Sequence, residues 1–352
     1  MSKIVILIPT LKSGGAEKQA ALLAASLSEL HEVHLLTFNC TANDSESNLK
    51  ILPANVKRVI ISGGVVKQFS SLKNYLRTAQ IEIMFNYLTK PNVLGSLAAK
   101  LAGVKYIYNG IRNSRLPFIK MICEQFAHNY WATASIYNCY SGEKYFSTKG
   151  FKKSKNIVIP NCFPNINPAI ERAVKDIKQI ITVGRFVPQK DYLTAIKAVS
   201  RLKGLRSDFK FIIVGYGEME GQIRNWIKDY NVEDVTDIYI NPKNIPQLLS
   251  ESDIYLSTSL FEGTSNSIME ALNASLPVVC TDVGDNSYLV KNNISGFIHT
   301  IKDYESISKS LSELIDSRSL RIDFGCTGNR ILHENYSVET FKTKYLNIIH
   351  SL

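Results

Sequence analysis

Two glutamates lie eight residues apart around a short polar loop in the second half of the chain. Glu262 follows a strand-like segment, and Glu270 lies just inside a segment with helical periodicity. Two carboxylates can serve as the acid and nucleophile of a glycosidase, but such pairs lie ~5–9.5 Å apart. Eight helical residues would separate these two by about 12 Å, which disfavours that chemistry. Ser267-Ile-Met-Glu270 also fits a capping box, so a structural cap and a ligand contact are both open for Glu270.

Two cations lie five residues apart in the loop Gly184-Arg185-Phe-Val-Pro-Gln-Lys190-Asp191. The loop follows an apolar segment and begins with a glycine, so its backbone can turn sharply. An arginine and a lysine placed in this way can converge on a diphosphate and offset the negative charge that builds on a leaving group. The alternative is that Arg185 and Lys190 are two solvated surface cations.

A pair of glycines, Gly14 and Gly15, separates the first strand-like segment from a helix-like one. Paired glycines let the backbone approach a ligand, and a helix N-terminus offers N–H groups to an anion. The pattern is not the G-x-G-x-x-G of dinucleotide-binding folds, so an ordinary strand-to-helix turn is the alternative. A true G-x-G, Gly215-Tyr-Gly217, is followed by Glu218 and Glu220, which would repel a pyrophosphate, so we predict a tight turn there.

These residues fall at the ends of segments that alternate between strand and helix patterns. Continuously apolar, β-branched runs predict parallel strands buried on both faces. The predicted strands are Lys3–Pro9, Glu32–Phe38, Val56–Ile61, Ile81–Asn86, Gln179–Val183, Lys210–Val214, Asp237–Ile240, Asp253–Ser257 and Pro277–Thr281. The predicted helices include one with Ala20, Leu23, Ala24 and Leu27 on one face, and Tyr192–Leu202, Gly221–Tyr230, Ile245–Ser250 and Ser267–Ala274. The fold class is therefore α/β, with two doubly wound, Rossmann-like domains facing each other across a cleft.

The charge is distributed unevenly along the chain. Residues 1–163 hold 20 Lys and Arg against 8 Asp and Glu, a net of +12, whereas residues 164–352 hold 21 against 23. Three prolines, at 160, 164 and 168, interrupt the chain at this change. The predicted parts are a first domain over 1–165, a second over 166–335, and a C-terminal helix over 336–352 that packs back on the first domain. A basic first domain should face nucleic acid, an acidic lipid surface or a diphosphate substrate.

The composition is that of a globular protein, with 45% hydrophobic and 20% charged residues in a chain of 352, which excludes a disordered or collagen-like chain. No apolar run reaches the ~18 residues of a membrane-spanning helix. The first residues enter a strand without the pattern of a secretory signal, so we expect a cytoplasmic protein. Six scattered cysteines without metal-ligand spacing predict reduced core thiols and no metal site.

Three segments together resemble the retaining glycosyltransferases of the GT-B fold, of the group 1 or family 4 type. They are Ser13-Gly14-Gly15-Ala16-Glu17, the Gly184-Arg185…Lys190 loop and the Glu262-x7-Glu270 signature, in that order. The likeness spans nearly the whole chain. It implies that the second domain binds a nucleotide-sugar, with a UDP-sugar favoured, and that the first binds a glycan acceptor.

The resemblance implies three catalytic residues. Arg185 and Lys190 would grip the donor diphosphate and stabilise the departing nucleotide, and Glu262 would face the hydroxyls of the donor sugar. No Asp-x-Asp motif occurs in the chain, which fits a mechanism without a divalent metal. The nucleotide-sugar is then a co-substrate, and no cofactor is expected.

The resemblance also implies a set of donor contacts. The backbone amides after Glu262 would lie near the sugar and phosphate, and Glu270 would accept hydrogen bonds from the ribose hydroxyls. The expected donor-binding residues are Gly14, Gly15, Gly184, Gly263, Thr264, Ser265, Asn266 and Glu270.

The first domain departs from the family pattern. The segment after Lys105–Tyr108 lacks the histidine that many relatives carry, and we expect Arg112 in its place. In the later loop, Tyr288 occupies a position where a glutamate is common. These departures concern the sugar contacts and not the class of reaction.

The stretch Val65–Ala79 predicts a basic amphipathic helix. Val65, Phe69, Leu72, Leu76 and Ala79 share one face, and Lys67, Lys73 and Arg77 lie away from it. With Arg112, these three cations are the expected acceptor-binding residues. Such a helix can meet an anionic interface or a lipid diphosphate, or it can be an ordinary packed helix with a solvated basic side. Phe118–Tyr130 is a second candidate helix, and Lys149–Lys155 is a basic loop.

The leading hypothesis is a retaining, metal-independent transferase that moves a hexose to a polyprenyl-diphosphate-linked or other glycan acceptor. It would act as a peripheral protein on an anionic membrane surface, the inner face of the cell membrane. Two alternatives stay open: a nucleotide-sugar 2-epimerase of similar fold, and a basic nucleic-acid-binding or scaffolding protein. The last lacks a helix-turn-helix pattern and the interleaving of aromatic and basic residues, so we expect no nucleic-acid partner.

Overall fold

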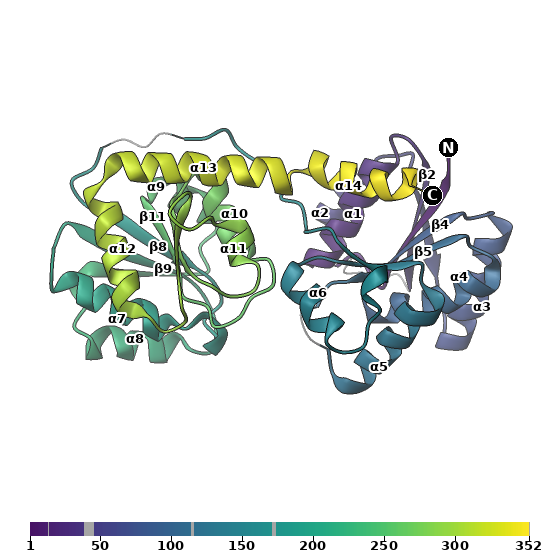
Figure 1. Cartoon of the computed structure of the whole chain (residues 1–352), viewed down its shortest axis with the longest axis horizontal. Helices are drawn as coiled ribbons and strands as arrows, with labels where there is room; N and C mark the ends of the chain where they lie inside the picture. Colours follow the sequence, from purple (N-terminus) through teal and green to yellow (C-terminus); the bar gives the residue numbers. More distant parts are fainter. Residues whose placement is uncertain (13, 39–45, 114–115, 171–173, 352) are drawn as a thin grey trace. The chain divides into compact units, whose positions relative to one another are not determined.

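The computed structural model describes residues 1–12, 14–38, 46–113, 116–170 and 174–351. Within these ranges the chain forms two compact units. Unit 1 consists of Met1–Cys162 with Val338–Leu352, and unit 2 consists of Phe163–Ser337. Each unit is a parallel β-sheet with helices packed on both faces (Figure 1). The predicted α/β class with two Rossmann-like domains is confirmed.

The sheet of unit 1 has seven strands in the described part of the chain, in the order β3-β2-β1-β4-β5-β6-β7. Its strands are β1 (Lys3–Ile8), β2 (Glu32–Phe38), β3 (Lys57–Ile61), β4 (Ile83–Tyr87), β5 (Tyr106–Ile111), β6 (Ala134–Tyr137) and β7 (Asn156–Val158). Its helices are α1 (Gly15–Leu27), α2 (Glu46–Ile51), α3 (Val65–Thr78), α4 (Ser96–Ala102), α5 (Phe118–Phe126), α6 (Tyr140–Ser147) and α14 (Val338–His350), with the short π-helical segments η1 (Pro91–Gly95) and η2 (Ala127–Trp131) and the 3₁₀ helix η3 (Lys153–Lys155).

The apolar residues of β1 alternate between two cores. Ile4, Ile6 and Ile8 pack with residues of α1 and α14 on one face of the sheet. Val5 and Leu7 pack with residues of α3 and α4 on the other face. Because successive side chains point to opposite faces and both faces are covered, the strand is apolar throughout. That continuous pattern is what predicted a buried parallel strand.

The sheet of unit 2 has six strands in the described ranges, in the order β10-β9-β8-β11-β12-β13. Its strands are β8 (Lys178–Val183), β9 (Phe209–Gly215), β10 (Thr236–Ile240), β11 (Ile254–Ser257), β12 (Val278–Thr281) and β13 (Gly296–His299). Its helices are α7 (Tyr192–Lys203), α8 (Glu220–Asp229), α9 (Ile245–Glu251), α10 (Asn266–Asn273), α11 (Asn286–Leu289), α12 (Tyr304–Asp316) and α13 (Arg318–Tyr336), with η4 (Pro188–Lys190) and η5 (Glu233–Val235).

The direction of chain progression reverses once in each sheet. In unit 1 the reversal lies between β1 and β4, and in unit 2 it lies between β8 and β11. Doubly wound sheets bind ligands at the carboxyl ends of the strands on either side of such a reversal. The loops after β1, β4, β8 and β11 are therefore the places where a site is expected.

The cysteines only partly follow the sequence expectation. Cys139, Cys162 and Cys280 are buried thiols, but Cys123 and Cys326 are exposed, so the prediction of core thiols is wrong for these two. Both lie on the outer faces of helices, α5 and α13, whose inner faces pack on the sheets. Cys40 lies outside the described residues. Across the described ranges, no helix is both long and apolar enough to cross a bilayer.

Candidate active site

Two loops of unit 2 meet at the reversal of the sheet. One follows β8 and contains Arg185 and Lys190, and the other follows β11 and contains Glu262. Because β8 and β11 are paired neighbours, both loops leave the same edge of the sheet. The Leu260 backbone N–H donates to the Gln189 carbonyl at 2.8 Å, and the Gln189 side chain donates to the Phe261 carbonyl at 2.7 Å. These two bonds fix one loop against the other.

Lys190 and Glu262 form an ion pair between these loops. The Lys190 Nζ donates to the Glu262 Oε1 at 2.6 Å, and the two side chains are only 18% and 10% exposed. The Ser259 Oγ donates to the same oxygen at 2.8 Å. Since both bonds end on Oε1, Oε2 is left for a ligand within the part of the chain that the structure describes. Of the expected catalytic residues, the structure brings these two into contact.

The loop after β8 is stabilised by hydrogen bonds from buried hydroxyl groups to its backbone carbonyls. The Tyr192 hydroxyl donates to the Gly184 carbonyl at 2.9 Å, and burial raises the pKa of Tyr192, which keeps it a neutral donor. The Thr258 hydroxyl lies within hydrogen-bond distance of the Lys190 and Asp191 carbonyls. A Cβ on Gly184 would lie 3.2 Å from the Lys190 side chain, so a glycine leaves room for the lysine to lie over the loop.

Gly284 supports the loop that carries Glu262. Its φ is +58°, a left-handed conformation that favours glycine, and a Cβ there would lie 2.4 Å from the Glu262 carbonyl oxygen. The next residue, Asp285, donates its backbone N–H to the Gly263 carbonyl at 3.0 Å. The segment after β12 is thus in direct backbone contact with the segment after β11.

The stretch from Gly263 to Asn266, which the resemblance predicts to bind the donor, leads into α10. Ser265 is the residue before the helix, and Asn266 is its first residue. The structure does not support the capping-box alternative for Ser267–Glu270, because Ser267 already lies inside the helix and Ser265, the residue before the helix, makes no side-chain cap. The first backbone N–H groups of α10 thus have no side-chain cap within the described residues, which suits an anion at this end.

Glu270 lies in the second turn of α10 and lines a cavity of about 280 Å³ within unit 2. The cavity is mostly apolar, and Ile245, Pro246 and Leu249 of α9 form one side of it. Glu270 and Asn273 are among its polar residues. An apolar wall beside a carboxylate can hold a flat ring together with hydroxyl groups attached to it.

Two predicted features of unit 2 lie beside the ion pair. Arg185 follows Gly184 directly, and its side chain is exposed, not packed against Glu262. Gly215 and Gly217 pack behind this loop, because a Cβ on either would meet the backbone of Gly184 or Phe186 at under 3 Å. The predicted tight turn at the G-x-G is confirmed, and it supports the loop from the far side.

The paired glycines belong to unit 1, at the start of α1 after β1. Gly14 precedes the helix and accepts a backbone hydrogen bond from Lys18 at 3.0 Å. The Glu17 carboxylate occupies the space where a Gly14 Cβ would lie, whereas Gly15 faces open space. Ser13 lies outside the described residues.

Arg112 follows β5 and is bonded to the rest of unit 1. Its guanidinium donates to the Tyr345 hydroxyl at 3.0 Å and to the Asn161 side-chain oxygen at 3.3 Å. It also lies 4.3 Å from the centre of the Tyr87 ring. Arg112 therefore links β4, β5 and α14, and a second role in acceptor binding would use its Nε, which is buried without a partner in the described ranges.

The three cations of α3 are not gathered at one place. Lys67 lies in the first turn and Arg77 in the last, about 15 Å further along the helix axis. The Lys3 ammonium, at the start of β1, bonds to the Ala79 carbonyl at the end of α3. Lys73 and Arg77 thus lie toward the amino ends of the strands, and the structure does not bring them to the end of β5 where Arg112 lies.

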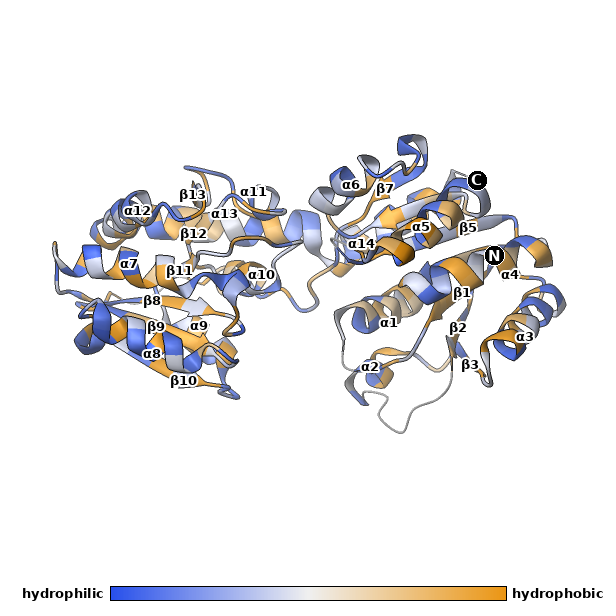
Figure 2. Cartoon of the chain, turned by 90° about the horizontal axis from the view of Figure 1, so that it is seen from below, coloured by the Kyte–Doolittle hydropathy of each residue, from blue (hydrophilic) through white to orange (hydrophobic). Residues whose placement is uncertain are grey.

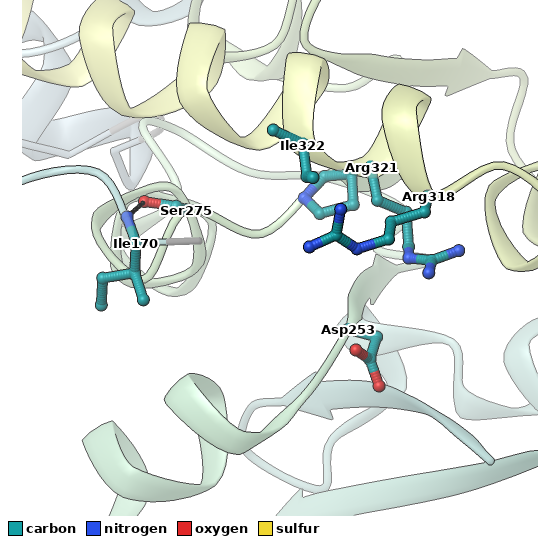
Figure 3. A pocket seen from close by; sticks show the side chains of 7 residues that line it. Ile170, Asp253, Ser275, Arg318, Arg321 and Ile322 are labelled. Carbon is teal, nitrogen blue, oxygen red and sulfur yellow. Dashed lines mark hydrogen bonds between the residues drawn. The ribbon is translucent and has the colours of Figure 1, made fainter. Parts of the chain in front are cut away.

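A smaller cavity of unit 2 lies at the opposite edge of its sheet. Arg318 and Arg321 project from α13 toward Asp253, which directly precedes β11 (Figure 3). The cavity is about 20 Å³, the size of one water, and Arg321 donates to the Ile315 carbonyl at the end of α12. We interpret this cluster as structural. Among the described residues, no three His, Cys, Asp or Glu side chains are grouped as metal ligands.

Comparison with known proteins identifies the class of enzyme to which this chain belongs. Residues 165–330, almost all of unit 2, match the family model described as glycosyl transferases group 1. The chain is 27% identical over 294 residues, 76% of this chain and 75% of the relative, to UDP-Gal:alpha-D-GlcNAc-diphosphoundecaprenol alpha-1,3-galactosyltransferase of Escherichia coli. The chain is a glycosyltransferase, and its unit 2 carries the group 1 domain.

Other relatives of this glycosyltransferase extend over more of its length. It is 25% identical over 91% of its chain, and 92% of the relative, to N-acetylgalactosamine-N,N'-diacetylbacillosaminyl-diphospho-undecaprenol 4-alpha-N-acetylgalactosaminyltransferase of Campylobacter jejuni. Among solved structures, Anabaena HepE in complex with UDP aligns over the whole of both chains with a TM-score of 0.83 at 17% identity. At that identity the likeness shows the fold, which is GT-B.

The sequence reasoning missed several residues that hold the site of this glycosyltransferase together. Ser259 bonds to Glu262, Thr258 bonds to the loop of Lys190, and Gly284 permits the close backbone contact. Ser259 and Thr258 could have been found from the sequence, since they directly follow a predicted strand. Gly284 could not, because its role depends on a contact across 22 residues.

Proposed function

We propose that this glycosyltransferase moves a hexose from a UDP-sugar to a glycan carried on a polyprenyl diphosphate, with retention at the anomeric carbon and without a divalent metal. It would act as a peripheral protein at the inner face of the cell membrane. The observation that carries the donor half of this proposal is the Lys190–Glu262 pair at the reversal of the unit 2 sheet.

The site suggests how the donor would be held. Negative charge builds on the diphosphate as the bond to the sugar breaks, and the ammonium of Lys190 with the exposed Arg185 can offset it. The uncapped start of α10 adds further N–H donors. Glu262 offers Oε2 to the sugar hydroxyls, and Glu270 offers its carboxylate to the ribose beside the apolar wall of α9.

The acceptor half of the proposal is supported by relatives. The names of the Escherichia coli and Campylobacter jejuni relatives describe acceptors on diphosphoundecaprenol and α-linked products. An α-linked product from an α-linked nucleotide-sugar requires retention. The net +12 of residues 1–163 suits an acceptor that carries a diphosphate and resides in a lipid surface.

The test combines donor binding with turnover. Thermal shift with UDP, GDP, ADP and NAD should show stabilisation by UDP, about 2.7 kcal/mol at about a hundred times the dissociation constant. The protein is then incubated with a panel of UDP-hexoses and a polyprenyl-diphosphate-linked sugar, with and without EDTA. We expect acceptor-dependent UDP release that EDTA leaves intact, and an α-linkage in the product by NMR.

Two outcomes would overturn the proposal. A new sugar product formed from the donor alone would favour an epimerase. Loss of turnover with EDTA, restored by a divalent cation, would refute the metal-independent mechanism. Glu305→Ala is the matched control for site variants, because Glu305 is an exposed carboxylate of unit 2 paired with Arg201 away from the site.

A further inference from the structure

A helix of unit 1 carries an apolar stripe on its outer face. α5 continues without interruption into η2, and large apolar side chains of this segment are between 47% and 76% exposed. They are Phe118, Ile119, Ile122, Phe126 and Tyr130. Four of them recur every fourth residue, which places them along one side of a helix. The apolar residues of α5 are orange in Figure 2.

The opposite face of this segment is fixed to the interior of unit 1. Glu124 is buried, and its two carboxylate oxygens accept hydrogen bonds from the Asn92 side chain at 3.1 and 2.9 Å. Ala127 and His128 are fully buried beside it. The His128 ring bonds to the Ser135 hydroxyl at 2.7 Å. These contacts fix one side of the helix toward the interior of unit 1, and the apolar stripe on the opposite side is therefore exposed.

A basic loop is bonded along the same segment. The Asn129 side chain donates to the Gly150 carbonyl and accepts from the Lys152 backbone N–H, both at 3.1 Å. His128 bonds to the Lys152 carbonyl at 3.1 Å. The Lys152 ammonium lies 5.4 Å from the centre of the Tyr130 ring. The apolar stripe therefore has lysines fixed at its edge.

The charge around the stripe is of one sign. Residues 88–160 contain eleven Lys and Arg but only two acids, Glu124 and Glu143. Glu124 faces inward, and Glu143 accepts hydrogen bonds from Ser147 and Asn156. The exposed cations near the stripe are Lys100, Lys120, Lys149, Lys152 and Lys153.

Helix α3, which the sequence predicted to meet an anionic interface, differs from α5 because its apolar face is largely buried. Leu72 and Leu76 of α3 are buried in the core with α4, and Phe69 is partly buried against it. Only Val65 and Val66, at the beginning of α3, are exposed large apolar residues. The apolar face of α3 is thus already occupied, whereas the outer face of α5 is not.

We propose that the α5–η2 stripe, with the lysines of residues 149–153, is the surface that docks unit 1 on an anionic phospholipid bilayer. Apolar side chains enter the boundary between headgroups and acyl chains, and the lysines meet lipid phosphates. Tyr130 and Trp131 are of the aromatic type that favours this boundary. The inference rests on the proposed function, since a lipid-linked acceptor is presented in such a bilayer.

The first experiment measures flotation of the full chain with vesicles of phosphatidylcholine, with or without phosphatidylglycerol. We expect binding to the anionic vesicles at least tenfold stronger than to the neutral ones. Raising NaCl from about 0.1 M to about 1 M shortens the screening length from about 10 Å to about 3 Å and should weaken the binding. Equal binding to both vesicle types would overturn the role of the lysines.

The second experiment separates this surface from other exposed residues. Combining Phe118→Ser, Ile119→Ser and Ile122→Ser should reduce binding at least tenfold. Val65→Ser with Val66→Ser on α3 is the matched apolar control and should reduce it less than twofold. Lys149→Gln, Lys152→Gln and Lys153→Gln should also weaken binding, whereas Lys228→Gln, Lys243→Gln and Lys309→Gln on unit 2 should not. Melting temperatures within about 2 °C of wild type establish that each variant is folded.

The results that refute this surface differ from those that refute the proposed function. Wild type that shifts with UDP but does not float with anionic vesicles overturns the docking surface and leaves the donor site intact. Wild type that floats with anionic vesicles but is not stabilised by any nucleotide supports the docking surface and refutes the proposed donor site. If the stripe variant binds vesicles as wild type does but changes a dimer to a monomer in light scattering, the stripe is a contact between copies and not a membrane surface.

Discussion

The two units share one architecture but place their polar residues differently. In unit 2, polar side chains gather at the carboxyl ends of the central strands, where Lys190, Ser259 and Glu262 form a hydrogen-bonded cluster. In unit 1, polar residues on the central strands point inward. Asn86 of β4 and Asn109 of β5 are buried and bonded to each other at 3.0 Å. Unit 1 instead exposes large apolar side chains on the outer face of α5.

This difference explains why the candidate site of unit 2 was found from sequence motifs, whereas the candidate docking surface of unit 1 was found from the exposure and charge of its side chains. A small, charged ligand needs a few groups at fixed positions, which leaves a short motif such as Glu262-x7-Glu270. A lipid surface needs only an apolar face with cations around it, and many sequences satisfy that requirement. The family model accordingly covers residues 165–330, in unit 2.

The largest expected effect comes from the central pair of unit 2. Glu262→Ala should lower kcat/KM with donor and acceptor by about 10²–10³-fold, because it removes the group that we propose contacts the reacting sugar and leaves Lys190 unpaired. Steady-state turnover of the variant and of Glu305→Ala measures the effect. Turnover within twofold of wild type would show that Glu262 takes no part in the reaction.

Glu124, a buried carboxyl group of unit 1, should affect the free energy of unfolding and not the catalytic rate. Burial raises the pKa of Glu124 to about 7, from 4.5. Between these values the folded chain holds a proton that the unfolded chain releases, so stability falls as the pH rises from about 4.5 through about 7. Glu124→Gln cannot lose that proton, and its stability relative to wild type should rise across this range by on the order of 3 kcal/mol.

Melting temperatures of wild type and Glu124→Gln at pH 5, 6, 7 and 8 test this prediction. Gln125→Ala, at the neighbouring position of α5, is the control, because its side chain does not titrate and its offset should stay constant with pH. An offset for Glu124→Gln that is equally constant would show that the carboxylate is ionised in the folded chain throughout.

Two glycines, one from each unit, offer a sharper contrast. Both Gly284 and Gly103 have positive φ, but a Cβ on Gly284 would meet the Glu262 and Gly263 carbonyl oxygens at 2.4 and 2.7 Å, while one on Gly103 meets nothing within 4 Å. Gly284→Ala should therefore cost about 2 kcal/mol more than Gly103→Ala. Urea denaturation measures both. Equal costs would mean that the loop around Glu262 relaxes freely.

The smallest expected effect concerns nucleotide affinity. Glu270→Ala should weaken UDP binding about tenfold, since it removes the charged acceptor that we propose for the ribose hydroxyls. Titration calorimetry compares it with Glu251→Ala, which changes an exposed carboxylate at the end of α9 outside the cavity lining. Unchanged affinity in Glu270→Ala would assign this cavity to something other than the nucleoside.

The strands were the most predictable part of the fold. Strand β1, predicted over Lys3–Pro9, covers Lys3–Ile8, and β8, predicted over Gln179–Val183, covers Lys178–Val183. Burial on both faces makes such strands continuously apolar, so the signal is local. The short strands β6 and β7, of four and three residues, were not predicted. They are too short for a pattern of their own: β6 depends on pairing with β5, and β7 depends on pairing with β6.

The candidate site was predictable residue by residue, but its connections were not. The sequence singled out Lys190 and Glu262, yet their ion pair spans 72 residues and depends on β8 and β11 being neighbours. For Arg112 the resemblance suggested a ligand contact, and the structure adds bonds to Asn161 and Tyr345. Tyr345 lies 233 residues further along the chain, so no local pattern could reveal that partner.

The ends of unit 2 meet each other. The Phe163 backbone N–H donates to the Tyr336 carbonyl at 2.7 Å, one residue from the end of this unit, and the chain then continues into Val338 of unit 1. Unit 2 is therefore an insertion within a host domain, and its two termini coincide in space. A contiguous module of this kind can be exchanged between relatives in a single cut at each end. On the proposed function, donor preference would move with this one contiguous piece of sequence, whereas the proposed acceptor-binding unit requires two separate pieces, Met1–Cys162 and Val338–Leu352, to be moved together.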